Sequence, residues 1–333
     1  PISSAGALAF FIARLGVGAG EAGCMPAAVS LLADKFRPSL RGTAMSLFSI
    51  GAALGALMGS AGGGWMEQHH GWRAALLVFG AAGLPLAAVV VLGFREPGRG
   101  VFDVRQSPPA RAGFRATLEH ILRCRSLLHV IAGTTVLTFW GWGLVWWTPS
   151  FLVRSFQMTV GGAGEFLGMV HGVGGVLAML GAAYVLSRAF ARSDIVQARM
   201  VAWLTAAATL PSFMAYASAS QALAQAMLWA FIPTIYLYIG PSISMAQNLT
   251  PAAMRGQVIG IIVFATNIAN LVIAPQAIGF LSDCIAPHVG GAAESLRYVL
   301  MAVSWTGLWA AWHFRAAARH MRSERLEFTL AAP

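Results

Sequence analysis

The hydrophobic positions of this chain form long uninterrupted runs and do not alternate with polar ones. A helix of about 20 apolar residues crosses about 30 Å of hydrocarbon, and each run has about that length or more. Because lipid offers no partner to open backbone groups, and the runs lack the alternation of barrel strands, we expect helices. The sequence predicts about nine transmembrane helices, near residues 6–33, 42–65, 72–94, 126–152, 161–187, 199–218, 221–247, 255–283 and 295–316.

The composition agrees with a chain that lies largely in lipid. Hydrophobic residues make up 57% of the 333 positions and charged residues only 10%, whereas a soluble domain carries about 25% charged residues. Cys24, Cys124 and Cys284 lie far apart, which argues against a disulfide framework or a zinc site. No HExxH, GxSxG or P-loop pattern occurs, so we expect no enzyme, no cofactor and no metal site.

The positive charges predict how the helices cross the membrane. Eighteen of the 22 Lys and Arg residues fall at alternate helix ends, and only Arg73, Arg154 and Arg297 fall at the opposite ends. The richer side is expected to be cytoplasmic, which places the loop 95–125 and the tail 317–333 inside. The net charge of +10 is thereby explained by topology, and nucleic acid is not an expected partner. We expect a multi-pass protein of a bacterial cytoplasmic (inner) membrane.

Two ionisable residues lie inside the first apolar run. Arg14 and Glu21 are seven residues apart, so they share one helix face within about 20° and are separated by about 10 Å along the axis. Charges in hydrocarbon are costly and usually face a bundle interior or a water-filled path. The hypothesis is that Glu21 loads and releases a proton, while Arg14 binds an anionic head group or stabilises the deprotonated Glu21. The alternative is a structural ion pair with partners on neighbouring helices.

An internal repeat relates the two ends of the chain. The segment DKFRPSLRGTAMS (34–46) is similar to NLTPAAMRGQVIG (248–260), and GWRAALLVFGAAGL (71–84) is similar to SLRYVLMAVSWTGL (295–308). The first three predicted helices are therefore equivalent to the last three, in the same orientation, as in parallel repeats. Three further helices precede the second copy. The simplest interpretation is two six-helix halves, of which the first lacks its first three helices.

These features together resemble the major facilitator superfamily, and within it the spinster-like branch of lysolipid and sphingolipid transporters. The residues that carry the resemblance are Arg14-x-x-x-Gly18-x-x-Glu21-Ala22, Asp34 with Arg41, Gly71-Trp72-Arg73, WWTPSFLVRSF (146–156), Gly240-Pro241 and Pro251-x-x-x-Arg255. The resemblance implies an all-α membrane protein with two six-helix bundles. Residues 1–94 would be helices 4–6 of the N-terminal bundle, 95–125 the cytoplasmic central loop, 126–316 the C-terminal six-helix bundle and 317–333 a cytoplasmic tail.

Three further sets of residues are candidates for working parts of such a fold. Asp34, Arg41 and Arg255 lie at cytoplasmic helix ends, where salt bridges can latch a gate; the alternative role is substrate binding. Polar and aromatic residues inside predicted helices are candidates for a substrate cavity, although each could serve helix packing instead: Phe139, Trp140, Trp142, His171, Asn267 and Asn270. Glycines at steps of four residues predict close helix packing: Gly51, Gly55, Gly59 and Gly63 on one helix, and Gly164, Gly168 and Gly172 on another.

The resemblance implies secondary active transport by alternating access, with protons as the coupling ion. The implied substrate is an amphipathic anion such as a lysophospholipid, carried by a monomer in the bilayer. Two alternatives stay open: a proton-coupled porter of small organic acids or drugs, and a truncated fragment that does not transport.

Overall fold

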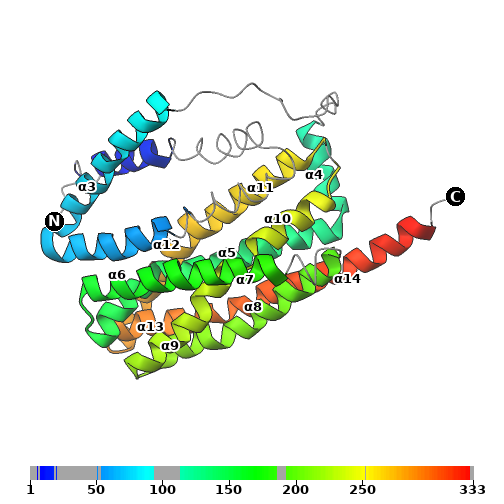
Figure 1. The fold of residues 1–333 in the computed structure, drawn as a ribbon. Coiled ribbons are helices and arrows are strands. Elements are labelled where there is room, and N and C mark those ends of the chain that lie inside the picture. The colour runs from blue at the N-terminus through cyan, green and yellow to red at the C-terminus, as the bar shows by residue number, and fades with distance from the viewer. Residues whose placement is uncertain are drawn as a thin grey trace. The chain divides into compact units, whose positions relative to one another are not determined.

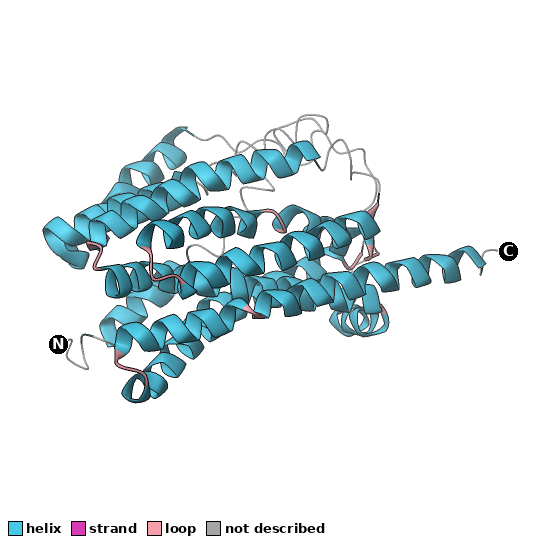
Figure 2. Cartoon of the chain, turned by 90° about the horizontal axis from the view of Figure 1, so that it is seen from below, coloured by secondary structure: helices cyan, strands magenta, loops and turns pink. Residues whose placement is uncertain are grey.

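The structure is a computed structural model, and it is helical wherever it has regular structure (Figure 1). It describes residues 6, 8–18, 20, 51, 54–93, 113–185, 193–251 and 253–330. No strand occurs in these ranges, as Figure 2 shows. The predicted all-α fold is therefore confirmed. Glu21, Asp34 and Arg41 lie outside the described residues.

The chain divides into two compact units. The first comprises Pro1–Ala52 and Leu77–Ser107, and the second comprises Ala53–Leu76 and Pro108–Pro333. The described part of the first unit contains the apolar helix Leu8–Gly18 and the end of helix α3, Gly63–Gly93. Residues 53–76 thus group with the C-terminal helices, because they pack directly on them through small residues.

Two helical stretches meet within α3, at Gly71. Its backbone has φ 78° and ψ 160°, a conformation that glycine adopts without the steric cost that other residues would meet. The apolar runs at 42–65 and 72–94 predict two helices with a break between them, and Gly71 lies in that interval. A short π-helix, η1 (Met58–Gly62), precedes α3.

The second unit contains one long element for each of the six apolar runs between residues 126 and 316. The first is the helix α5, Arg125–Phe156. Several of the following ones are interrupted by π or 3-10 turns. In chain order they are α6 (Val160–Met169), η2 (Val170–Gly174) and α7 (Gly175–Val185); α8 (Asp194–Ala217); α9 (Gln221–Phe231), η4 (Ile232–Tyr236) and α10 (Ile239–Asn248); α11 (Arg255–Asn267), η5 (Ile268–Ile273) and α12 (Ala274–Ile285), followed by η6 (Ala286–His288); and α13 (Ala292–Ser304) and α14 (Thr306–Leu330).

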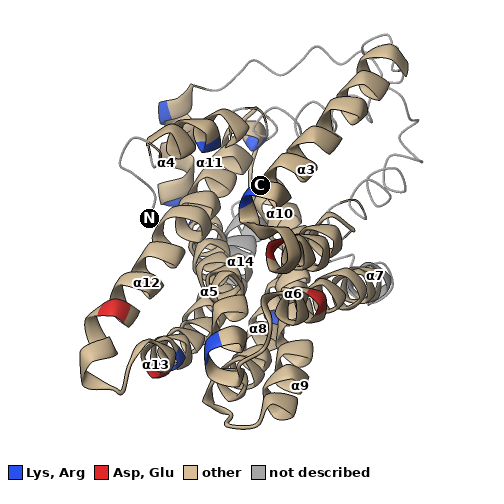
Figure 3. Ribbon diagram, turned by 90° about the vertical axis from the view of Figure 1, so that its left-hand side faces the viewer, with Lys and Arg blue, Asp and Glu red and all other residues tan. Residues whose placement is uncertain are grey.

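Six helical stretches of the described residues are long and apolar enough to cross a membrane. They are Leu54–Gly93 and five of the six elements above, all except the pair α13 and α14. Figure 3 shows how few charged residues these helices carry. The central helix of the second unit is α5, which packs against α14, α13, α11 and α10. Its inward side is fully buried at Leu127, Leu144 and Phe151. The core of the second unit is therefore built around α5.

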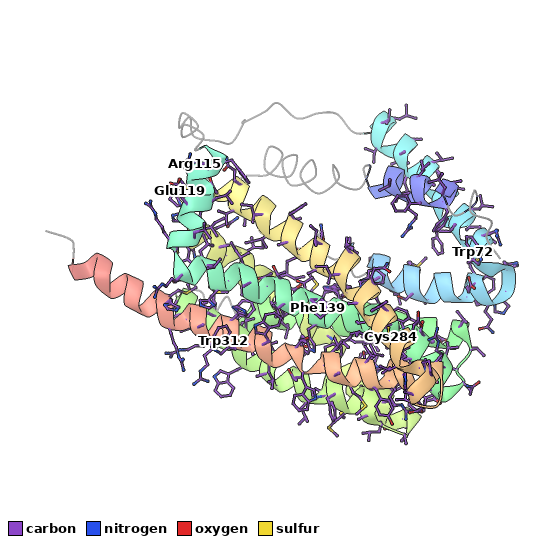
Figure 4. All side chains as sticks on the ribbon, turned by 180° about the vertical axis from the view of Figure 1, so that it is seen from behind. Trp72, Arg115, Glu119, Phe139, Cys284 and Trp312 are labelled. Atoms are coloured by element: carbon purple, nitrogen blue, oxygen red, sulfur yellow. The ribbon has the colours of Figure 1, made fainter. Side chains whose placement is uncertain are left out.

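Two helical segments extend beyond the predicted membrane helices. The helix α4, Phe114–Arg123, lies inside the predicted central loop. Thr117 Oγ1 donates to Gln257 Oε1 at 2.6 Å, and the Arg115–Glu119 ion pair of 3.2 Å spans one turn of its exposed side (Figure 4). The helix α14 continues through most of the predicted tail to Leu330, because no glycine or proline interrupts residues 308–330.

Candidate functional site

The helix interruptions of the second unit meet around α5. The π-helix η2 contacts the 3-10 helix η4, and α5 contacts both η4 and the π-helix η5. Pro233 stands in the first turn of η4, where it cannot donate an α-helical hydrogen bond. The glycine-rich sequence of η2 permits a wide turn. Because π-bulges are frequent at functional sites, this region is the candidate site.

Five side chains at this point form a group that we call the aromatic cluster: Trp142, His171, Tyr236, Tyr238 and Thr138. A side-chain hydrogen bond between Tyr238 and Trp142 joins the last two to the others. His171 Nδ1 and the hydroxyl of Tyr236 are 2.8 Å apart and share a hydrogen bond. The Trp142 ring is nearly parallel to the His171 ring at 6.2 Å between centroids, and it meets Tyr236 edge-on at 5.7 Å. Three membrane helices therefore contribute to one group of polar and aromatic side chains.

A second hydrogen bond anchors the cluster on α5. The Thr138 hydroxyl donates to the carbonyl of Thr134 at 2.7 Å, so it accepts from the hydroxyl of Tyr238 at 2.9 Å. His171 and Tyr236 are 4% and 9% exposed. The cluster thus combines an aromatic surface with a small number of polar atoms, the combination that ligand sites use to bind an apolar body and orient a polar group.

The three neighbouring aromatic residues predicted for a cavity do not lie together. Trp142 belongs to the cluster. Trp140 does not: it is 1% exposed, and its ring is tilted by 54° against the ring of Phe231, with 5.0 Å between the centroids. A Cβ added at Gly307 would lie 2.8 Å from Trp140 Cε2, so Trp140 is a core residue packed on α14. Phe139 is partly buried and packs against the core (Figure 4).

Asn270 and Asn267 differ in their surroundings. Asn270 Oδ1 accepts from Trp146 Nε1 at 2.7 Å, which joins η5 to α5. Trp147, the neighbour of Trp146 on α5, makes a second bond between the helices: its Nε1 donates to the carbonyl of Pro275 at 3.1 Å. Asn267 is exposed. Asn270 therefore makes the helix-to-helix hydrogen bond that membrane-embedded amides commonly make.

The three glycines predicted to pack closely in the run 161–187, Gly164, Gly168 and Gly172, all lie at a close contact between two helices. An ideal Cβ at Gly164 would lie 3.0 Å from Gly64 Cα, one at Gly168 would lie 2.9 Å from Ala61 Cβ, and one at Gly172 would lie 2.9 Å from Leu57 Cβ. Side chains larger than hydrogen would push the two helices apart at each of these positions. The contact is extended by Gly161, whose N–H donates to Gln68 Oε1 at 2.8 Å.

The opposing helix presents a different face from the one the sequence predicts. Positions Gly51, Gly55, Gly59 and Gly63 have no described neighbour within 4 Å of an added Cβ. The contacting residues are instead Leu57, Ser60, Ala61 and Gly64. The mismatch begins before the π turn of η1, because Gly55 precedes that turn and the contact is made by Leu57. These two positions are about 200° apart around a helix, so the contacting face is nearly opposite the glycine face. The glycine stripe of this helix is thus displaced from the contact.

The predicted charged residues are placed as follows. Arg255 Nε donates to the carbonyls of Gln247 at 3.0 Å and Thr250 at 3.1 Å, which caps the end of α10. Arg14 is exposed on the helix Leu8–Gly18. Its predicted partner Glu21 lies outside the described residues. Among the residues that the structure describes, no group of three His, Cys, Asp or Glu could hold a metal ion.

Sequence reasoning missed Tyr236, Tyr238 and Thr138. Each is a hydroxyl in an apolar run, and such residues are common in helix packing. The available signal was Pro233, since a proline inside a transmembrane helix frees backbone groups that nearby hydroxyls can satisfy.

Several known proteins have sequences similar to this chain. The model of the Major Facilitator Superfamily matches residues 2–274. An MFS-type efflux pump of Mycolicibacterium smegmatis is 29% identical over an alignment of 319 positions, which covers 93% of this chain and 71% of that protein. Protein spinster homolog 1 of Xenopus tropicalis is 25% identical over an alignment of 348 positions, which covers 95% of this chain and 64% of that protein. The chain therefore spans about two thirds of these relatives.

A solved structure has the same fold. It is a bacterial homologue of the human lysosomal transporter spinster in an inward-facing, unoccupied conformation, with a TM-score of 0.77 and 22% identity over 92% of this chain and 77% of that one. The resemblance to spinster-like proteins that the sequence motifs indicate is confirmed by these matches. With a family model matched over most of its length, the chain belongs to the Major Facilitator Superfamily, a family of membrane transporters.

Proposed function

We propose that the protein is a secondary active transporter that moves an amphipathic anion, such as a lysophospholipid, by alternating access coupled to protons. The observation that carries this proposal is the likeness to spinster homologues, in sequence and in fold, over more than nine tenths of this chain. The proposed location is a bacterial cytoplasmic membrane.

The aromatic cluster is the proposed C-terminal part of the binding surface. Trp142 would support the apolar portion of the substrate, and the His171–Tyr236 hydrogen bond would orient its polar portion. Interrupted helices support this role, because transporter sites are typically built where transmembrane helices are discontinuous. The interruptions at η2 and η4 lie beside these side chains.

The proposed coupling chemistry belongs to the N-terminal helices. Glu21 would carry the proton, and Arg14 would attract the anionic head group or stabilise the deprotonated Glu21. The proposed gate pairs Asp34 and Arg41 with Arg255. Both Arg255 bonds use Nε, and a guanidinium has five N–H donors, so its terminal nitrogens suit a carboxylate.

The test is uptake of labelled lysophosphatidylglycerol into proteoliposomes with an imposed proton gradient. We expect gradient-driven uptake, its loss in Glu21→Gln, and its retention in Glu165→Gln, a control that removes an exposed carboxylate of α6. Unchanged uptake by Glu21→Gln at every pH would refute the proton role of Glu21. Absence of lysolipid uptake by the unmodified protein would refute the proposed substrate.

A second candidate is a proton-coupled exporter of drugs or small organic acids. It is favoured by the likeness to the mycobacterial efflux pump, which extends over 93% of this chain. The discriminating experiment measures accumulation of ethidium and of labelled benzoate in cells with and without the protein. Lower accumulation of either compound, without lysolipid uptake, would favour this candidate. No transport in either assay would favour a fragment that does not transport.

A further inference from the structure

A groove of about 430 Å³ runs along the surface of the second unit between α8 and α14. It contains none of the residues of the aromatic cluster. Its two walls carry Arg199 and Trp203 from α8, and Trp312, Arg315 and Arg319 from α14. Residues far apart in the sequence therefore create one surface feature that neither helix has alone.

The arginine end of the groove has excess positive charge. Arg199, Arg315 and Arg319 are exposed. No carboxylate among the described side chains, which end at Met321 on α14, lies within 4.0 Å of their side-chain nitrogens, since the ion pairs found there involve Arg115 and Arg297. Arg315 and Arg319 are one helical turn apart, a spacing at which like charges repel. Three converging cations therefore favour an anion from outside the described part of the chain.

The tryptophans place this end at the membrane surface. Trp203 is 67% exposed and Trp312 is 54% exposed, and Figure 4 shows Trp312 on α14. Indole rings concentrate at the level of lipid head groups. Arg315 lies 5.9 Å from the centroid of the Trp203 ring, which links the two walls. By the positive-charge bias of the loops, this surface is the cytoplasmic one.

The remainder of the groove is narrow, apolar and elongated. Its lining includes Ala202 and Ala311, both buried and small, which leaves room that larger side chains would fill. From Arg319 to Leu308 the groove follows α14 for eleven residues, about 16 Å at 1.5 Å per residue. A cationic end joined to an apolar channel of this length matches a phosphate head group followed by an acyl chain.

We infer that this groove binds one anionic phospholipid of the cytoplasmic leaflet. The phosphate lies among the three arginines, and an acyl chain lies along the alanine floor. Basic pockets between transmembrane helices on the cytoplasmic side recognise anionic head groups in this way. The arginines at these helix ends thus have a binding role in addition to their effect on topology. A site on α8 and α14 can also fail without affecting the transport proposal, which rests on other residues.

The experiment is native mass spectrometry of the detergent-purified protein with phosphatidylglycerol, and with phosphatidylcholine of the same acyl chains. The test variant is Arg315→Gln/Arg319→Gln. The matched control is Arg123→Gln/Arg125→Gln, which removes two exposed arginines near α4 that do not line the groove. We expect preferential retention of phosphatidylglycerol, weakened about 30-fold in the test variant and less than about twofold in the control.

Two further variants separate charge from shape. Arg315→Lys/Arg319→Lys keeps the charge and should retain most of the binding. Ala206→Phe keeps every arginine but fills the groove, and should reduce phosphatidylglycerol retention. Equal retention of the two lipids, equal loss in test and control variants, or unchanged binding by Arg315→Gln/Arg319→Gln would each overturn the inference.

Discussion

Replacement of Gly164 by alanine tests the close contact between α6 and the stretch that includes η1. The added Cβ would lie 3.0 Å from Gly64 Cα and still nearer to the carbonyl oxygen of Ser60. Carbon atoms in contact normally lie about 3.5–4.0 Å apart. Both obstructing atoms belong to the backbone, so no side-chain rotation relieves the clash, and the helices must separate by several tenths of an ångström.

Overpacking of this kind costs about 1–3 kcal/mol. Alanine is also about 1 kcal/mol more favourable than glycine in a helix interior, so the measured change would combine the two effects. Gly181→Ala is the matched control: it lies in α7, the continuation of the same span, and has no described atom within 4 Å of its added Cβ. The difference between the two variants isolates the steric cost.

The assay is the thermal unfolding midpoint of each purified variant in the same detergent, followed by tryptophan fluorescence. One kcal/mol shifts the midpoint of a chain of this size by roughly 2 °C. We therefore expect Gly164→Ala to unfold about 2–6 °C below Gly181→Ala. Equal midpoints would refute the contact, because a helix pair able to accept the methyl group cannot be as close as described.

Three further substitutions test other parts of the second unit. Gly307→Ala places a Cβ 2.8 Å from Trp140 Cε2 and still nearer to Thr209 Oγ1, and it should lower the unfolding midpoint by several degrees. Its effect should be non-additive with that of Thr209→Ala, which removes the nearest obstruction; additive effects would contradict the contact. Tyr236→Phe and His171→Phe should show a coupling of about 1 kcal/mol in a double-mutant cycle of unfolding; additive effects would contradict the hydrogen bond. Arg255→Ala should speed backbone hydrogen exchange at 247–250 without altering exchange in α8, and unchanged exchange would contradict the capping role.

The hydrophobic pattern predicts the membrane helices because apolar length is the dominant requirement in lipid. The break at Gly71 is also predictable, since the chain must reverse between the two runs. The helix α4 is different. Its ten residues lie within a charged, proline-bearing stretch, and the short segment gains its stability from bonds to distant residues, such as the one from Thr117 to Gln257. No local pattern reports those bonds.

The candidate site shows where sequence reasoning reaches its limit. Trp140 and Trp142 are separated by about 200° around an ideal helix, so they face different neighbours, and only Trp142 reaches the cluster. The sequence cannot decide which of the two faces inward without knowledge of the packing. The glycine stripe poses the same difficulty, because Leu57, Ala61 and Gly64 make the contact in place of Gly55, Gly59 and Gly63, and the spacing of the glycines does not say which face meets a neighbour.

The arginines near the cytoplasmic helix ends illustrate how the fold adds meaning to a sequence signal. In the sequence, Arg199 and Arg315 contribute equally to a charge count that orients the helices. In the structure, they line one groove together with Arg319, although more than one hundred residues separate the two helix ends. A topology rule requires only that these charges lie on the same side of the membrane. Their convergence beside an apolar channel is a further restriction, and binding of an anionic lipid supplies a physical reason for it.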